Sequence, residues 1–179
     1  MKGKAVTRAA WGRIRLFAMD VDGVLTDGTV SVSSDGTETK RFAVIDGLGL
    51  ATLRDAGLEL AWISGRQSAA SSLRAAELRI PHVIQGRHDK LAALSELAAA
   101  LGIALRDCAY MGDDVIDAPA IAAAGIGISV PTGLPPAIAA ADYVTRRLPG
   151  LGAVREVCDL ILEARARAGG NRAGRLRTK

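Results

Sequence analysis

The stretch from Ile14 to Gly23, which reads Ile-Arg-Leu-Phe-Ala-Met-Asp-Val-Asp-Gly, decides the fold class of this chain. Its first six residues are mostly apolar and predict a buried strand, and Asp20 and Asp22 follow where that strand ends. Side chains alternate along a strand, so both carboxylates can face one pocket beyond its carboxyl end. Asp20 could then attack a phosphorus atom, while Asp22 protonates the departing oxygen and later activates water.

Two other interpretations of this motif stay open when it is taken alone. A calcium-binding loop also begins with this pattern, but it needs a Glu at its twelfth position, which here is Ser31. An ordinary turn also uses Asp and Gly in this way. The rest of the chain has to decide between these alternatives and phosphoryl transfer.

Two further predicted strands end in groups that bind phosphate. The strand predicted over residues 58–63 leads directly into Ser64-Gly65-Arg66, which offers a hydroxyl, a backbone amide and a guanidinium. The strand predicted over residues 82–86 leads to Lys90, which stands before a helix predicted over residues 91–101. A lysine there can reach into a pocket as a point charge.

A fourth predicted strand, residues 109–111, runs into the acidic segment from Gly112 to Asp117. Carboxylates beside a phosphate site would repel the substrate unless a hard cation lies between them. Mg²⁺ prefers oxygen ligands and usually takes one or two carboxylates, so it fits this requirement.

The chain resembles the haloacid dehalogenase superfamily of phosphatases, whose four motifs occur here in order. They are Asp20-Val21-Asp22, Ser64, Lys90 and Gly112-Asp113-Asp114. The resemblance implies these catalytic residues: Asp20, Asp22, Ser64 and Lys90. The implied ligands of Mg²⁺ are Asp20, the Asp22 carbonyl and Asp113, with Asp114 and Asp117 behind them.

The spacing of the first two motifs excludes a separate cap domain. Ser64 follows Asp20 by 44 positions, and a small domain usually needs about 50 residues or more. Residues 29–32 and 38–42 instead alternate in polarity and predict a β-hairpin. A lone hairpin is marginally stable in water, so we expect it to pair with other subunits of a homo-oligomer. Its apolar side chains that would be buried there are Val30, Val32 and Phe42.

This layout resembles the capless subgroup that hydrolyses keto-sugar acid phosphates such as 3-deoxy-D-manno-octulosonate 8-phosphate, a step towards lipopolysaccharide. The resemblance covers about residues 16–162 and implies a homotetramer. The implied substrate-binding residues are Asp22, Val44, Asp46, Gly47, Gly65, Arg66, Arg74 and Lys90. Ile45 and Ala51 stand where the family has arginines. The alternatives are therefore a phosphatase for nine-carbon keto-sugar acids, as in sialic-acid pathways, and a non-catalytic relative that binds through its basic ends.

The strand and helix patterns alternate and predict an α/β fold, a doubly wound, mostly parallel sheet with helices on both faces. Further strands are expected at residues 125–130 and 143–145, and an apolar helix face at residues 154–162. The predicted organisation is a flexible basic arm (1–13), one phosphatase domain (14–168) and a flexible basic tail (169–179).

Composition agrees with a single compact enzyme, since the chain has 179 residues and is 49% hydrophobic. No apolar run is long enough for a membrane span and no signal peptide is evident, so a cytoplasmic location is expected. Only 3% of residues are aromatic, which argues against nucleic acid as a partner despite the basic ends. The two cysteines indicate no disulfide framework, and His82 and His88 are interpreted as local structure rather than metal ligands.

Overall fold

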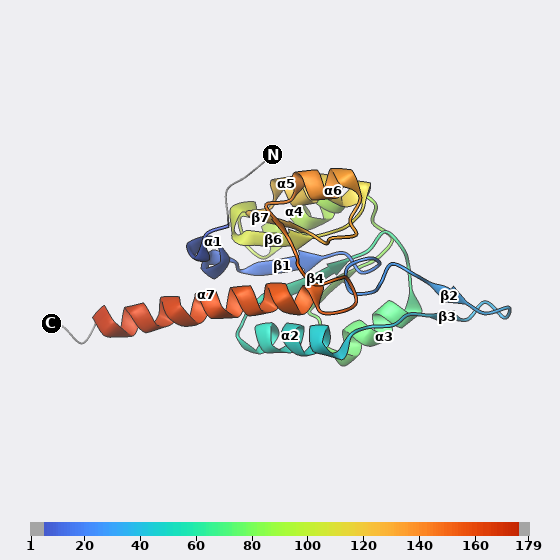
Figure 1. Cartoon of the computed structure of the whole chain (residues 1–179), viewed down its shortest axis with the longest axis horizontal. Coiled ribbons are helices and arrows are strands. Elements are labelled where there is room, and N and C mark those ends of the chain that lie inside the picture. Colours follow the sequence, from blue (N-terminus) through green and yellow to red (C-terminus); the bar gives the residue numbers. More distant parts are fainter. Residues whose placement is uncertain (1–5, 176–179) are drawn as a thin grey trace.

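The computed structural model describes residues 6–175, and within them a six-stranded parallel sheet forms the centre of the molecule (Figure 1). The strand order is β5-β4-β1-β6-β7-β8. The strands are β1 (Leu16–Met19), β4 (Glu59–Ile63), β5 (His82–Ile84), β6 (Cys108–Met111), β7 (Ile126–Ser129) and β8 (Tyr143–Val144). The predicted doubly wound parallel sheet is confirmed.

Helices cover both faces of this sheet (Figure 1). On one face lie α1 (Arg8–Arg13), α2 (Val44–Asp55), α3 (Ala69–Glu77) and the long α7 (Ala153–Arg175). On the other face lie α4 (Lys90–Ala100), α5 (Ala118–Ala123) and α6 (Pro135–Ala140). Two short 3₁₀ turns, Leu105–Asp107 and Val115–Asp117, flank β6.

The alternation of side chains along β1 explains why there are two layers of apolar core. Phe17 and Met19 pack into the core beneath α2 and α7, whereas Leu16 and Ala18 pack into the core beneath α4 and α5. All four residues are fully buried. A strand that is apolar on both faces is typical of the centre of a parallel sheet.

The position of β1 in the sheet fixes where a ligand can bind. The chain runs from β1 outward to β4 and β5, then returns to the other side of β1 for β6, β7 and β8. In such sheets, ligands bind beyond the carboxyl ends of the strands at the point where the order reverses. The residues that follow β1, β4 and β6 therefore meet at one edge.

The predicted hairpin is present, but its paired strands are shorter than expected. β2 (Ser31–Val32) and β3 (Glu38–Thr39) are antiparallel and extend away from the body of the molecule (Figure 1). Phe42 was predicted to be buried between subunits. Its ring instead stacks on Trp62 of the same chain, with 6.1 Å between ring centroids, and packs against the core.

Part of the predicted N-terminal arm, Arg8–Arg13, is a helix that packs on the domain. Residues 1–13 were predicted to be a flexible arm, but Thr7 caps helix α1, and Trp11 is 5% exposed. The Trp11 ring meets Tyr143 edge-on at a centroid distance of 5.6 Å. The basic composition indicated a solvated arm, but the apolar side chain of Trp11 anchors α1 to the core.

The boundary predicted at residue 168 does not coincide with a change of secondary structure, because α7 continues to Arg175. The remainder of the two basic ends, residues 1–5 and 176–179, lies outside the described residues. Among the helices of residues 6–175, none has the length and apolar character needed to cross a membrane.

Candidate active site

Asp20 lies at the carboxyl end of β1, where it is paired with a buried lysine. Its backbone amide bonds to the Met111 carbonyl, which continues the sheet pairing to the last position before the loop. Lys90, the first residue of α4, places Nζ 2.8 Å from Asp20 Oδ1 and 3.1 Å from Asp117 Oδ1. The Lys90 side chain is fully buried, so its charge is opposed by carboxylates rather than by water.

Asp117 organises the acidic segment behind this pair. Its Oδ1 also accepts a hydrogen bond of 2.7 Å from the Tyr110 hydroxyl, and its Oδ2 accepts from the backbone amides of Asp113 and Asp114. A Cβ on Gly112 would lie 2.4 Å from the Asp117 Cβ, so only glycine allows this tight fold. Asp117 is thereby held as a fixed acceptor beside Lys90.

The carboxylates of this site are held close together with little solvent. Burial raises the pKa of Asp20 to about 6; Lys90 opposes this rise and Asp117 adds to it. Burial also raises the pKa of Asp113 to about 7, and repulsion from Asp20, Asp117 and Asp114 contributes further. For Lys90, burial lowers the pKa, but Asp20 and Asp117 outweigh that effect and leave it raised.

The same geometry suits a hard divalent cation. One carboxylate oxygen from each of Asp20, Asp113 and Asp117 lies within 4.8 Å of the others. Oδ1 of Asp113 is buried and has no hydrogen-bond partner. Gly23 has a positive φ of 85°, and a Cβ there would lie 2.1 Å from Asp113 Oδ2, so glycine lets this carboxylate approach. Asp20 and Asp113 thus offer carboxylate oxygens of the kind that Mg²⁺ prefers, whereas both oxygens of Asp117 already accept hydrogen bonds from Lys90, Tyr110 and two backbone amides.

A cavity of about 300 Å³ opens beside these groups. The predicted site residues that line it are Asp20, Asp22, Ser64, Gly65, Arg66, Asp113 and Asp114. Lys90 and Asp117 reach the same place from beneath, through their contacts with Asp20. The structure therefore brings together the residues of all four motifs.

Ser64 and Arg66 are positioned by the end of β4. The Ser64 amide bonds to the Ile84 carbonyl of β5, and the Ser64 hydroxyl accepts from the Arg66 amide at 3.1 Å. This turn keeps the hydroxyl at the cavity wall. The Arg66 guanidinium is half-exposed and lies 3.0 Å from Glu38 of the hairpin.

Four residues implied as substrate contacts do not line this cavity. Both carboxylate oxygens of Asp46 accept hydrogen bonds from backbone amides at the start of α7, those of Gly152 and Arg155. The Arg74 guanidinium contacts Glu77 and lies against Gly47. Val44 is 79% exposed at the start of α2. Within this chain Asp46 joins α2 to α7, and Arg74 packs α3 against α2. The assignment of all four residues to substrate stays a prediction.

Sequence reasoning missed two charged or titratable residues at the site. His88, interpreted as local structure, lines the cavity together with Ile116, and its ring lies over Gly65. Lys40 of the hairpin is buried against Asp22, with Nζ 2.6 Å from Oδ1. Lys40 follows directly after β3, and it reaches Asp22 through the fold-back of the hairpin across 18 positions of the chain, which no local sequence pattern shows.

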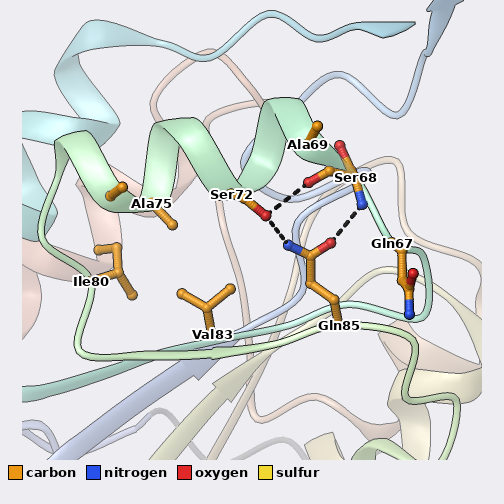
Figure 2. A pocket seen from close by; sticks show the side chains of 9 residues that line it. Gln67, Ser68, Ala69, Ser72, Ala75, Ile80, Val83 and Gln85 are labelled. Carbon is orange, nitrogen blue, oxygen red and sulfur yellow. Dashed lines mark hydrogen bonds between the residues drawn. The ribbon is translucent and has the colours of Figure 1, made fainter.

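A larger groove of about 670 Å³ lies between α3 and β5, away from the acidic residues. Figure 2 shows the Gln85 side chain joining the two elements through the Ser68 amide and the Ser72 hydroxyl. The rest of its wall is mainly apolar, including Ala75, Ile80 and Val83. The groove has no titratable lining residue, so the smaller cavity is the better candidate for chemistry.

A family model described as haloacid dehalogenase-like hydrolase matches residues 67–152. The 3-deoxy-D-manno-octulosonate 8-phosphate phosphatase KdsC of Escherichia coli K12 is 45% identical over 154 residues, which cover 86% of this chain and 82% of that protein.

Solved structures agree with the sequence matches. The structure of 3-deoxy-D-manno-octulosonate 8-phosphate phosphatase from Moraxella catarrhalis, in complex with magnesium ion, phosphate ion and a KDO molecule, has a TM-score of 0.88 and 51% identity, covering 93% of this chain and 96% of that one. The cobalt-bound deoxy-D-mannose-octulosonate 8-phosphate phosphatase of Haemophilus influenzae has a TM-score of 0.84 and 38% identity, covering 88% and 92%.

The parallel sheet, the paired aspartates after β1 and the lysine at the start of α4 define a hydrolase of the haloacid dehalogenase class. The sequence identity to the relatives, and the share of both chains that it covers, identify the family within this class. This chain belongs to the 3-deoxy-D-manno-octulosonate 8-phosphate phosphatase family.

Proposed function

We propose that this protein hydrolyses the phosphate ester of 3-deoxy-D-manno-octulosonate 8-phosphate, with Mg²⁺ and through a phosphorylated Asp20. The observation that carries the mechanism is the pairing of Asp20 with the buried Lys90 in a cavity that Asp22 and Ser64 also line. The M. catarrhalis relative supports the choice of substrate, because its structure contains magnesium, phosphate and KDO.

The first chemical step is transfer of the phosphoryl group to the protein. Asp20 attacks phosphorus, the bond from phosphorus to the sugar oxygen breaks, and Asp22 gives that oxygen a proton. Lys90 offsets the repulsion between Asp20 and the phosphate, and Ser64 offers a hydrogen bond to a phosphate oxygen. The products are the free sugar acid and an acyl phosphate on Asp20.

The second step restores the enzyme. Asp22, now ionised, accepts a proton from a water molecule, whose oxygen attacks phosphorus. The bond between phosphorus and Asp20 breaks, and inorganic phosphate leaves. Asp20, the Asp22 carbonyl and Asp113 would hold Mg²⁺, which supplies positive charge against the phosphate oxygens when bound. Asp114 and Asp117 stand behind these ligands, and Asp117 fixes Lys90.

The substitution Asp20→Asn tests this assignment. It should abolish release of phosphate from the sugar-acid phosphate, a loss of at least about 10³-fold in kcat, because an amide is nearly isosteric with the carboxylate but is a poor nucleophile. Circular dichroism and thermal unfolding should show a folded protein. Phosphate release from the purified variant at a rate near that of the parent would contradict the assignment.

The substrate pocket and the cellular context complete the proposal. Arg66 at the cavity wall is the strongest candidate to meet the sugar acid, with Gly65 beside it. The other implied contacts, Val44, Asp46, Gly47 and Arg74, would have to act around the entrance rather than in the cavity. We propose a homotetramer that works in the cytoplasm, in which the protruding hairpins pair and neighbouring subunits close the open sites.

A further inference from the structure

Lys40 is the best-buried charged side chain of the hairpin, and it contacts Asp22. Its side chain is 0% exposed. Nζ donates a hydrogen bond of 2.9 Å to Asp22 Oδ2, and it lies 2.6 Å from Oδ1. A lysine is rarely buried without a reason, because removing an ammonium group from water is costly unless a partner is fixed beside it.

The environment of Lys40 holds its ammonium group in one place. The Ser71 hydroxyl of α3 lies 3.2 Å from Nζ, and a carboxylate oxygen of Glu38 lies 3.9 Å away. Glu38 in turn accepts hydrogen bonds from Ser68 and Arg66. Gln85 fixes the first turn of α3 through Ser68 and Ser72, as seen in Figure 2. Contacts from α3, and from Gln85 directly after β5, therefore surround Lys40 and its neighbour Glu38.

Lys40 approaches both oxygens of the Asp22 carboxylate. Nζ donates a hydrogen bond of 2.9 Å to Oδ2 and lies closer still, at 2.6 Å, to the buried Oδ1. Asp22 itself lines the cavity with Asp20 and Ser64. The ammonium group thus contacts the carboxylate as a whole from the hairpin side, while Asp22 lines the cavity on the other.

We propose, on the basis of the function proposed above, that Lys40 is the positioning residue of Asp22. Lys40 fixes the orientation of the Asp22 carboxylate, which faces the oxygen of the leaving group and then the attacking water. Lys40 keeps its own protons throughout. Lys40 is not among the residues that line the cavity, so its effect on the substrate passes through Asp22.

This role predicts a dependence on the leaving group that a purely structural role would not produce. The alkoxide of a sugar needs a proton as it departs, whereas 4-nitrophenolate is stable without one. Misplacing the proton donor therefore slows the first step for an alkyl phosphate much more than for an aryl phosphate. The parameter kcat/KM reports that first step and is unaffected by breakdown of the phosphorylated enzyme.

The test compares Lys40→Met with its parent on 3-deoxy-D-manno-octulosonate 8-phosphate and on 4-nitrophenyl phosphate, in the full chain with saturating Mg²⁺. We expect kcat/KM to fall about 30-fold or more for the sugar phosphate and less than about threefold for the aryl phosphate. Arg41→Met removes the neighbouring, exposed cation and should change neither value. Ser71→Ala removes a second contact of the ammonium group. It should lower kcat/KM less than Lys40→Met does, but again mainly for the sugar phosphate. This variant tests the proposal if Lys40→Met does not fold.

Asp22→Asn separates this proposal from the function on which it rests. That variant should show the same selective loss, and adding Lys40→Met to it should cost little more, since both changes act through one carboxylate. If Asp22→Asn is selective but Lys40→Met and Ser71→Ala lower both substrates equally or lower neither, Lys40 is not a positioning residue. If Asp22→Asn itself shows no selectivity, the acid and base role of Asp22 fails and the role of Lys40 fails with it.

Discussion

At the scale of single residues, the catalytic groups were predictable because each follows directly on a strand. The alternation of β1 identified Asp20 and Asp22 as neighbours in one pocket, and both line the cavity. Lys40 and His88 were not predictable in this way. Lys40 meets Asp22 only after the hairpin has folded back across 18 positions of the chain, and no local pattern encodes that contact.

The raised pKa values of the metal-site carboxylates predict that Mg²⁺ binding depends on pH. The pKa is about 6 for Asp20 and about 7 for Asp113, and a protonated carboxyl group is a poor ligand. Between pH 8 and pH 6 the deprotonated fraction falls roughly tenfold for Asp113 and twofold for Asp20. Together these decreases should weaken Mg²⁺ binding about 20-fold. Calorimetric titration with Mg²⁺ at the two pH values measures this ratio.

The matched control is Asp113→Asn, which removes the group with the higher pKa. It should bind Mg²⁺ more weakly at pH 8 and keep only the small dependence due to Asp20. An affinity of the parent protein that is equal at pH 6 and pH 8 would contradict the prediction.

The same shifts give a second pH effect, in the metal-free protein. Both carboxyl groups have folded-state pKa values above the ordinary value of 3.8. Between pH 3.8 and the raised values of about 6 and 7, the folded protein therefore binds more protons than the unfolded chain. Their stabilising contribution is present below about 3.8 and is lost as the pH rises through about 6 and 7. The melting temperature of the protein in chelator should fall from pH 5 to pH 8 relative to that of Asp20→Asn/Asp113→Asn. Equal pH profiles for the two proteins would refute this reasoning.

At the scale of helices and strands, the sheet followed from the sequence, and the helix contacts did not. Apolar runs between polar turns predicted all six parallel strands. The signal is clearest for the four central strands β4, β1, β6 and β7, because a strand buried on both faces has a distinctive composition. The helical N-terminal segment was missed, since five basic residues in positions 1–15 outweighed Trp11 in the estimate from composition. Asp46 was assigned to substrate by resemblance, and the structure shows what it does within the chain.

Asp46 joins α2 to the start of α7. Its buried carboxylate accepts a hydrogen bond of 2.7 Å from the Arg155 amide and one of 3.2 Å from the Gly152 amide. The first backbone amides of a helix have no acceptor within the helix. Asp46 provides that acceptor from another helix, as an N-capping residue would do locally. Asp46→Ala should lower the free energy of unfolding by about 2–3 kcal/mol.

Chemical denaturation measures that change, and Asp55→Ala is its matched control. Asp55 ends the same helix, and its side chain is 68% exposed and pairs with the adjacent Arg54, so its removal should stay within about 0.5 kcal/mol. Equal losses for the two variants would show that the contacts with α7 do not stabilise the fold.

At the scale of the whole molecule, the hairpin is the part of the fold that a single chain leaves unfinished. β2 and β3 contain two residues each and project from the body without pairing to the central sheet (Figure 1). Val32 is 68% exposed on this hairpin. Its inner face, by contrast, carries Glu38 and Lys40 into the site. A hairpin of this size is marginal in water, so its outer surface needs another partner if its inner surface is to hold the site.

We therefore expect the protein to be a homo-oligomer whose assembly and activity depend together on the hairpin. Val30→Asp combined with Val32→Asp would place charges in the apolar contact, where an unpaired carboxylate is strongly disfavoured. Sedimentation velocity should show a shift from the oligomer to the monomer. The value of kcat/KM for the sugar-acid phosphate should fall at least about tenfold, because the loosened hairpin no longer holds Asp22 and the site opens to water. Ile138→Asp, a partly exposed apolar position on α6, is the control and should leave both properties unchanged. A parent protein that sediments as a fully active monomer at assay concentration would refute closure of the site by neighbouring subunits, while the chemistry at Asp20 would stand on its own test.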